Sequence, residues 1–417
     1  MKILFLLYDF YPNFGANSLI INNLSQSFIK KGHEVHILPL SIDPLTPQKE
    51  IWNELHIHRV TQTFDKKQVR KFILEFKILS AIKLLFHLMK ERFNKKEYLA
   101  THWSYFSVTE FSNIVDNNTI DIVINVCFPF ESSLPIIKYL KKRKKEFKWI
   151  VYMQDPFATN YYYMYRYSMG ELLEFQRKVF GAADQIIVTD AMIKELKNVD
   201  TNLSLAKFKI LDFPKIFRPL RTEEVDDIIF NSRYINCVYI GKFNRNTRNP
   251  QLLFQLFEAL EKDMIRLHII GEERDNWMEY LSDRTSNISF YGQRSNEVSI
   301  NAELNSNILV NLGNNVSNQL PSKLLEYIST GKPILNLYKI ENCPSLDYMD
   351  KYPVCLNVFE GDINFEKTLR RLRYFCIKYR NTNIKYQYIS QKFYSSTLDY
   401  VSHEFLNLFD ELINVKH

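Results

Sequence analysis

Short apolar runs alternate with amphipathic, helix-like segments along most of the chain. In the first half the apolar runs cover residues 2–8, 32–40, 120–126, 148–153, 185–190 and 209–213. A second series covers residues 236–243, 265–271, 287–292, 307–313 and 333–338. Runs this short and this continuously apolar are typical of strands buried in a parallel sheet whose two faces are covered by helices. The pattern predicts an α/β protein.

A polar stretch at residues 218–234 separates the two series, and it predicts a domain junction at about residues 215 to 233. The chain of 417 residues is also too long for one ordinary core. We therefore predict a Rossmann-like N-terminal domain (1–215), a Rossmann-like C-terminal domain (216–390), and a C-terminal helical segment (391–417). This last segment is expected to pack near the junction and return to the N-terminal domain. In two doubly wound domains facing across a cleft, ligands would bind beyond the carboxyl ends of the strands.

Composition and cysteine usage indicate the compartment. The formal net charge is +7, and 46% hydrophobic with 24% charged residues is ordinary for a globular protein. Five scattered cysteines without a C-x-x-C pair favour a reducing environment. The first residues are interrupted too early by polar groups for a signal peptide, and no apolar run approaches the roughly 20 residues of a membrane helix. We expect a cytoplasmic protein.

The positive charge is concentrated in residues 66–96, where basic and large apolar side chains alternate at helical spacing. Such a helix either packs on its own domain with a basic outer face or lies on an anionic membrane surface. Peripheral association with the inner face of a membrane therefore stays open as an alternative. No nucleic-acid-binding module accompanies the charge, so nucleic acid is not an expected partner.

Several catalytic motifs are missing from the sequence. The glycines never occur as G-x-G, and neither G-x-S-x-G nor H-E-x-x-H is present. Hydride transfer, NTP hydrolysis, serine hydrolysis and metalloproteolysis thus lose their usual motifs. No two aspartates stand two residues apart, which removes the common metal clamp on a nucleotide diphosphate. We expect neither a metal nor a cofactor.

Two loops can instead bind an anion through cations and backbone. The loop at 241–250 places Lys242, Arg245 and Arg248 directly after a strand, and arginine can hold phosphate oxygens with two hydrogen bonds. The loop "SNQLPSK" leads into a helix N-terminus, with Lys323 in the first turn. A diphosphate between these loops would be neutralised without metal. A surface arginine that merely caps a loop is the alternative for Arg248.

A short helix follows this second loop in the stretch "NQLPSKLLEYISTGKPIL". Ser322 is the expected N-cap, Gly331 the expected C-terminal stop, and "PILNLY" a buried strand. The positions at helical spacing divide into an apolar side, Leu324, Leu325 and Ile328, and a polar side, Lys323, Glu326, Tyr327 and Thr330. On residue type alone, Glu326 is either a solvated surface charge or a ligand-binding carboxylate.

In order and spacing, these segments resemble glycosyltransferase family 4 of the GT-B enzymes, in particular bacterial cell-surface polysaccharide members. Its opening strand and "kGHeV" turn are similar to residues 1–38, and its "DfRDPW" variant is similar to "WIVYMQDPF". Its "AD-x-ii-x-t" strand resembles residues 179–192, its phosphate-binding loop residues 239–260, and its most specific signature residues 318–335. Residues 45–115 and those beyond 345 match only at the level of fold.

The resemblance implies a GT-B fold and transfer of a sugar from a nucleotide diphosphosugar with retention of anomeric configuration. It implies that Glu326 binds ribose hydroxyls, that Lys242 and Arg248 face the diphosphate, and that the Gly15–Ala16 loop closes on the donor. Asp155 would lie near the transferring sugar. The expected donor-binding residues are Gly15, Gly241, Asn318, Gln319, Leu320, Ser322, Lys323 and Glu326, and the expected catalytic residues are Arg248, Lys242 and Asp155.

The sequence departs from the family pattern at three places. Asn318 stands where the first of two glutamates is frequent, Gly15–Ala16 replaces Gly-Gly, and Cys127–Phe128 follow a strand where a histidine is frequent. We expect a retaining, metal-independent glycosyltransferase that acts on a glycan or lipid-linked acceptor in bacterial surface polysaccharide synthesis, such as that of a capsule. Asn318 motivates one alternative, a non-catalytic GT-B subunit that binds a partner or lipid carrier. Another nucleotide-sugar enzyme, such as a 2-epimerase, is the second alternative.

Overall fold

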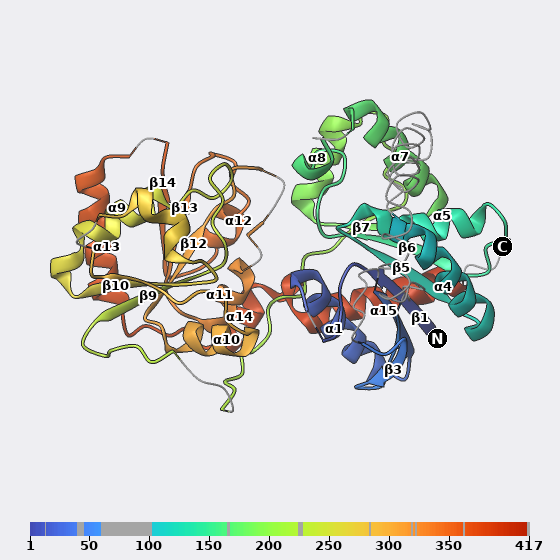
Figure 1. Cartoon of the computed structure of the whole chain (residues 1–417), viewed down its shortest axis with the longest axis horizontal. Coiled ribbons are helices and arrows are strands. Elements are labelled where there is room, and N and C mark those ends of the chain that lie inside the picture. The colour runs from blue at the N-terminus through green and yellow to red at the C-terminus, as the bar shows by residue number, and fades with distance from the viewer. Residues whose placement is uncertain are drawn as a thin grey trace, which may run out of the picture. The chain divides into compact units, whose positions relative to one another are not determined.

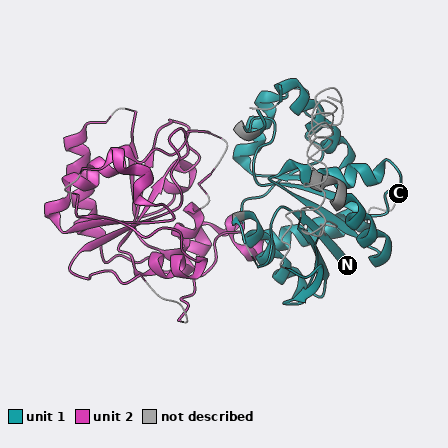
Figure 2. Ribbon diagram, viewed as in Figure 1, with its two compact units in different colours: residues 1–213, 401–417 teal, residues 214–400 magenta. Residues whose placement is uncertain are grey.

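A computed structural model describes residues 1–12, 14–39, 46–59, 102–164, 167–223, 228–282, 285–317, 320–321, 323–361 and 363–414. The chain divides into two compact units (Figures 1 and 2). Unit 1 comprises residues 1–213 and 401–417, and unit 2 comprises residues 214–400. These bounds differ from the expected divisions after residues 215 and 390. The basic segment at 66–96 lies outside the described residues.

Unit 1 is built on an eight-stranded sheet with the order β3-β4-β2-β1-β5-β6-β7-β8. The strands are β1 Lys2–Leu7, β2 Glu34–Pro39, β3 Lys49–Trp52, β4 Leu55–His58, β5 Ile122–Cys127, β6 Lys148–Met153, β7 Gln185–Val188 and β8 Phe208–Ile210. All neighbouring pairs are parallel except β3 with β4. The central strand β5 is buried along its whole length, as expected for a strand covered on both faces.

The helices of unit 1 cover both faces of this sheet. One face packs against α4 His102–Asn118, α5 Leu134–Leu140, α7 Met169–Ala182 and α8 Asp190–Val199. On the other face, Phe5 stacks on Phe28 of α1 Ala16–Ile29, and Phe28 also contacts Phe405 and Phe409 of α15 Leu398–Asn414. The expected return of the C-terminal helix to the N-terminal unit is confirmed.

The hairpin of β3 and β4 is an addition that the sequence pattern did not predict. Trp52 pairs with Leu55, so the loop contains only Asn53 and Glu54, and both have positive φ, of 48° and 65°. That is the geometry of a two-residue type I′ turn, which usually carries Asn-Gly. Because Glu54 stands where glycine is usual, the sequence does not show the Asn-Gly pattern that would have predicted the turn.

Three stacked histidines lie where this hairpin joins the sheet. The ring centroid of His36 in β2 is 4.9 Å from that of His56 and 5.2 Å from that of His58. His36 Nδ1 and His58 Nε2 are hydrogen-bonded at 3.0 Å, and Glu34 Oε1 is 2.8 Å from His36 Nε2. Burial lowers the pKa of His58 to about 4, and it also lowers that of His36.

Unit 2 is built on an entirely parallel six-stranded sheet with the order β11-β10-β9-β12-β13-β14. Its strands are β9 Ile235–Ile240, β10 Ile265–Ile270, β11 Ile288–Phe290, β12 Ile308–Leu312, β13 Ile334–Tyr338 and β14 Cys355–Phe359. This is the strand order 3-2-1-4-5-6 of a doubly wound nucleotide-binding sheet. Its topological switch point lies between β9 and β12, where the chain reverses its direction of winding.

The helices of unit 2 also lie on both faces. The apolar core joins the sheet to α9 Gln251–Ala259 and α13 Phe365–Tyr379. The chain on the other side contains α10 Asn296–Asn305, α11 Leu324–Thr330 and α14 Tyr386–Lys392, which neighbour one another in Figure 1. The remaining short elements are α6 Tyr161–Met164 and α12 Leu346–Met349, with 3-10 turns at Phe130–Ser133, Glu261–Asp263, Arg274–Tyr280 and Tyr394–Ser396. The predicted doubly wound α/β class is confirmed.

Candidate nucleotide-binding site

The loop after β9 starts with a close approach of two backbones. Gly241 has φ +142°, a conformation that favours glycine. Gly271 follows β10 with φ +108°, and a Cβ on it would lie 2.9 Å from the carbonyl oxygen of Gly241. Both glycines are therefore required for the two strand ends to pack, and Gly241 sits at the carboxyl edge of the sheet beside the switch point.

Arg248 bridges the two sides of the switch point. Its loop is closed by two backbone hydrogen bonds between Asn244 and Arg248, of 2.8 and 3.1 Å. From there the guanidinium donates from Nη2 and Nε to Oδ1 of Asn314, at 2.6 and 3.2 Å. Asn314 is buried and follows β12. The guanidinium is thus fixed at the point where a doubly wound sheet binds its ligand.

The other two cations of this loop differ from Arg248. Arg245 pairs with Glu279 at 2.9 Å and lies over the ring of Trp277, 5.9 Å from its centroid. Lys242 is exposed, and its carbonyl oxygen accepts a hydrogen bond from the Tyr239 hydroxyl at 3.2 Å. The structure therefore separates the loop's arginines, because Arg245 is engaged with the neighbouring 3-10 turn while Arg248 is directed to the switch point.

The short helix α11 begins later than expected. Its N-cap is Lys323, not Ser322, and no side chain caps it. The helix ends as predicted at Gly331, which has φ +74°. Tyr327 was expected on the polar side but is buried, and its hydroxyl oxygen accepts a hydrogen bond from the backbone N–H of Ile240 at 2.8 Å. This bond ties α11 to the carboxyl end of β9.

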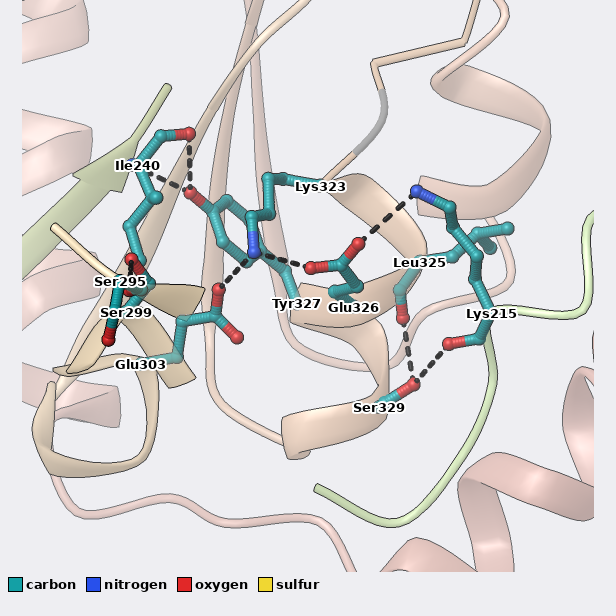
Figure 3. Close-up of polar contacts among 10 residues, drawn as sticks. All are labelled: Lys215, Ile240, Ser295, Ser299, Glu303, Lys323, Leu325, Glu326, Tyr327 and Ser329. Atoms are coloured by element: carbon teal, nitrogen blue, oxygen red, sulfur yellow. Dashed lines mark hydrogen bonds and ion pairs between the residues drawn. The ribbon is translucent and has the colours of Figure 1, made fainter. Parts of the chain in front are cut away.

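Glu326 is held between two lysines, as Figure 3 shows. Lys323 Nζ lies 2.5 Å from Glu326 Oε2, and Lys215 Nζ lies 3.2 Å from Oε1. The Glu326 side chain is 17% exposed. Burial alone would raise the pKa of Glu326, but the two lysines outweigh it and hold that pKa below its ordinary value. Glu326 is therefore an ionised, oriented acceptor and not a freely solvated charge.

The backbone around Lys215 is anchored on two sides. Ser329 in α11 donates to the carbonyl oxygen of Lys215 at 3.2 Å and to that of Leu325 at 2.9 Å. The next residue, Ile216, donates its N–H to Ser396 at 2.9 Å. The Lys215 side chain is accordingly buried, with 7% exposed, and directed at Glu326 (Figure 3).

A second carboxylate completes the cluster. Glu303, near the end of α10, is 2% exposed, and its Oε1 lies 3.3 Å from Lys323 Nζ. Burial raises the pKa of Glu303 to about 7, with Lys323 opposing the shift. Burial would lower the pKa of Lys323, but Glu303 and Glu326 outweigh it and raise that pKa. Lys323 thus contacts carboxylates in this structure, where the sequence predicted an anion-binding cation.

The predicted site residues of unit 1 lie at the carboxyl edge of its own sheet. Gly15 is the N-cap of α1, and a Cβ on it would lie 2.5 Å from Asp9 Oδ2, so a larger residue would require the Asp9 side chain to move. Asp155 follows β6 and donates its backbone N–H to the carbonyl oxygen of Cys127 at 3.3 Å. Asn318, Gln319 and Ser322 lie outside the described residues, and Leu320 is half-buried.

Comparison with solved structures identifies the architecture. Sucrose-phosphate synthase from Thermosynechococcus elongatus has a TM-score of 0.63 at 12% identity, with 100% of both chains covered. WaaG, described as a glycosyltransferase involved in lipopolysaccharide biosynthesis, has a TM-score of 0.60 at 15% identity, covering 99% of this chain and 100% of that one. A protein from Listeria monocytogenes assigned as a UDP-N-acetylglucosamine 2-epimerase scores 0.58 at 9% identity, covering 100% and 97%. The chain has the GT-B fold.

Neither a protein-family model nor a curated protein matches the sequence. The similarity to these GT-B structures is therefore one of fold, and the chemistry has to be argued from the site. The described part of the GT-B chain contains no helix long and apolar enough to cross a membrane. Nor does it contain a group of three or more histidine, cysteine, aspartate or glutamate side chains that could hold a metal ion.

Four residues of the GT-B site were not predicted from the sequence. Tyr327 carried a signal, since a tyrosine beside buried leucines often has a buried ring. Lys215 is separated from Glu326 by 111 positions, and Asn314 from Arg248 by 66. Glu303 lies in a mostly polar helix, so its burial has no periodic signature. These four residues are Lys215, Glu303, Asn314 and the buried Tyr327.

Proposed function

We propose that the chain is a retaining glycosyltransferase that moves a sugar from a nucleotide diphosphosugar to a glycan or lipid-linked acceptor. The observation that carries the proposal is the pairing, in one doubly wound unit, of a cation and an acceptor. Arg248 is fixed across the switch point by Asn314, and Glu326 is kept ionised within α11. The Arg248 guanidinium can bind the oxygens of a diphosphate, and the Glu326 carboxylate can accept hydrogen bonds from the hydroxyls of a ribose.

In the proposed complex Arg248 and Lys242 face the diphosphate. Charge grows on the diphosphate as its bond to the sugar breaks, so cations placed in advance stabilise the transition state more than the ground state. The acceptor hydroxyl forms the new bond to the anomeric carbon while the carbon–oxygen bond to phosphate breaks. The departing phosphate oxygen takes the hydroxyl proton, so this step needs no separate pair of carboxylates.

The remaining assignments follow the family resemblance. Gly241 lets the loop after β9 approach the phosphates, and residues 319–322, including Gln319, Leu320 and Ser322, offer backbone N–H groups. Asn318 contacts the transferred sugar. Gly15 and Asp155 act from unit 1 on the donor and the transferring sugar. We propose that the donor binds without a metal, with Arg248 and Lys242 in the role of the missing Asp-x-Asp clamp.

Two alternatives compete with this proposal. The Listeria protein is assigned as a 2-epimerase and shares the fold, so a nucleotide-sugar enzyme that forms no glycosidic bond is one of them. A non-catalytic GT-B subunit that binds a partner or lipid carrier is the other. Transfer to a glycan or lipid-linked acceptor in bacterial surface polysaccharide synthesis, such as that of a capsule, remains part of the proposal. So does a cytoplasmic location, with peripheral contact of residues 66–96 to anionic membrane.

The experiment begins with a thermal-shift screen of nucleoside diphosphates and their sugars in the presence of EDTA. The stabilising donor is then incubated with oligosaccharide and lipid-linked acceptors. Nucleotide release together with a new glycosidic bond supports the transferase. Release without a new bond supports the epimerase, and binding without turnover supports the non-catalytic subunit. Activity that disappears in EDTA and returns with Mg²⁺ or Mn²⁺ would contradict metal independence.

A further inference from the structure

Glu303 and Glu326 lie on opposite sides of the Lys323 ammonium (Figure 3). We propose that Glu303 is a positioning residue: through Lys323 it orients the Glu326 carboxylate toward the ribose hydroxyls of the donor. This inference rests on the proposed nucleotide-binding function and adds a residue that neither the sequence motifs nor the fold comparison indicates.

The geometry forms a relay of three side chains. Glu303 comes from α10, and the ammonium of Lys323 lies 3.3 Å from its Oε1 and 2.5 Å from Oε2 of Glu326. Lys215 contacts the other oxygen of Glu326 at 3.2 Å. Because Lys323 is shared, its position depends on the charge of Glu303. Glu326 can therefore be tuned from a residue that does not itself contact the donor.

The charges of the cluster balance only when Glu303 is ionised. Two lysines then face two carboxylates, and the ammonium of Lys323 is divided between Glu303 and Glu326. When Glu303 takes up a proton, Lys323 concentrates its charge on Glu326 and weakens that carboxylate as an acceptor for hydroxyls. The titratable groups facing Glu303 are Lys323, Glu326, Lys215 and Tyr327.

The transition falls near neutrality. The pKa of Glu303 is about 7, because burial raises it and Lys323 opposes the shift. The pKa of Glu326 is lowered and that of Lys323 is raised, so both keep their charges across the same pH range. Burial raises the pKa of Tyr327 well above its ordinary value, so it stays neutral. Within this set, Glu303 is the group that changes charge between pH 6 and 8.5.

The test isolates the ribose contact from the diphosphate. A nucleoside diphosphate and its 2′,3′-dideoxy analogue share base and phosphates, so the ratio of their dissociation constants reports the hydroxyl contacts alone. Calorimetry with wild type at pH 8.5 should give a preference for the ribonucleotide of about tenfold or more. That preference should fall by about threefold to tenfold toward pH 6, the size expected for weakening one charge-assisted bond.

Glu303→Gln keeps the side-chain shape but cannot ionise. Its ribose preference should be low at every pH and equal to that of wild type at pH 6. Glu297→Gln is the matched control, because Glu297 is exposed in the first turn of the same helix. It should retain the wild-type ratio and its pH dependence. The wild-type pH profile needs no variant, so it tests the proposal even if Glu303→Gln is poorly folded in thermal unfolding.

The outcomes separate the two proposals. No nucleotide binding in wild type overturns the proposed function and the relay together. Nucleotide binding and transfer without a ribose preference overturn the relay and leave the transferase standing. A ribose preference that is indifferent both to pH and to Glu303→Gln overturns the relay alone. An equal change in Glu297→Gln would assign the effect to helix charge and would also overturn it.

Discussion

Arg248→Ala should reduce kcat far more than it weakens donor binding. Two hydrogen bonds of 2.6 and 3.2 Å to Asn314 fix the guanidinium before any ligand arrives, so its charge is available without reorganisation. Losing one such preorganised group costs about 2.7–4 kcal/mol in the transition state, or roughly 100- to 1,000-fold in kcat. We expect KM for the donor to rise less than tenfold, because the ground-state diphosphate carries less charge at the breaking bond.

Two further variants should lower kcat by intermediate amounts, and a third serves as a control. Arg248→Lys keeps the charge but lacks the planar fork that bonds Asn314 twice, so kcat should lie between wild type and Arg248→Ala. Asn314→Ala should lower kcat by about tenfold through loss of orientation alone. Arg245→Ala is the control, since Arg245 stands in the same loop but pairs with Glu279. Steady-state transfer assays on folded variants decide: near-normal kcat in Arg248→Ala, or an equal loss in Arg245→Ala, would refute the reasoning.

Three other predictions concern single residues. Glu326→Ala should weaken donor and free nucleoside diphosphate alike, by roughly ten- to a hundredfold, because a charge–hydroxyl bond contributes about 1.5–3 kcal/mol; unchanged nucleotide affinity by calorimetry would remove Glu326 from the site. Asn318→Ala should spare free nucleotide and weaken the intact donor, and an equal loss for both would place Asn318 away from the sugar. The pKa of His58 is lowered from 6.5 to about 4 in the folded chain. As the pH falls, His58 therefore takes up a proton in the unfolded chain before it does so in the folded one. The contribution of neutral His58 to the free energy of unfolding is therefore complete above pH 6.5. It is lost as the pH falls, by about 1.4 kcal/mol per pH unit or roughly 2 kcal/mol at pH 5. In denaturant unfolding His58→Gln should lose less stability than wild type over this range, whereas exposed His403→Gln should match wild type.

The strands were predictable because a parallel strand covered on both faces must be apolar along its length. β9 and β12 are buried along their whole length and are apolar except for one asparagine in each, Asn236 and Asn311. β14 was not predicted; half-buried and buried positions alternate within "CLNVF". The same condition fails at β3, an edge strand in which exposed and half-buried residues alternate. The apolar pattern therefore located the other strands of both sheets, including the edge strands β8 and β11, and missed β3, β4 and β14.

The site was only half predictable, for a different reason. Lys242 and Arg248 stand in a loop that directly follows an apolar strand, and Glu326 stands in a short helix that ends at a glycine, so these positions could be recognised in the sequence. The side chains that contact these residues could not be recognised in the same way. A buried lysine in a connecting segment, or a glutamate near the end of a helix, resembles an ordinary surface charge until tertiary contacts are known. The sequence could name candidate ligand-binding residues, but the side chains that contact Arg248 and Glu326 include Asn314 and Lys215, which lie 66 and 111 positions away in the chain.

Stability and function make opposite demands on this cluster, and that opposition can be measured. Removing charges from water is costly, and replacing a buried ion pair by apolar side chains is often neutral or stabilising by about 1–4 kcal/mol. The double variant Glu303→Met/Lys323→Met should therefore unfold at equal or higher free energy than wild type. Lys323→Met alone should be less stable than the double variant, because it leaves Glu303 buried without its cation.

If the cluster serves ligand binding, the double variant should combine this retained stability with a loss of ribose preference. Denaturant unfolding and nucleotide calorimetry on the same preparation test both parts. A double variant that is markedly less stable than wild type would show that the ion pair contributes to folding in its own right. A stable double variant that still prefers the ribonucleotide would show that Glu326 needs neither Lys323 nor Glu303. We expect loss of preference without loss of stability, because the double variant leaves no buried charge unpaired at Glu303 and removes the Lys323 ammonium that orients the Glu326 carboxylate.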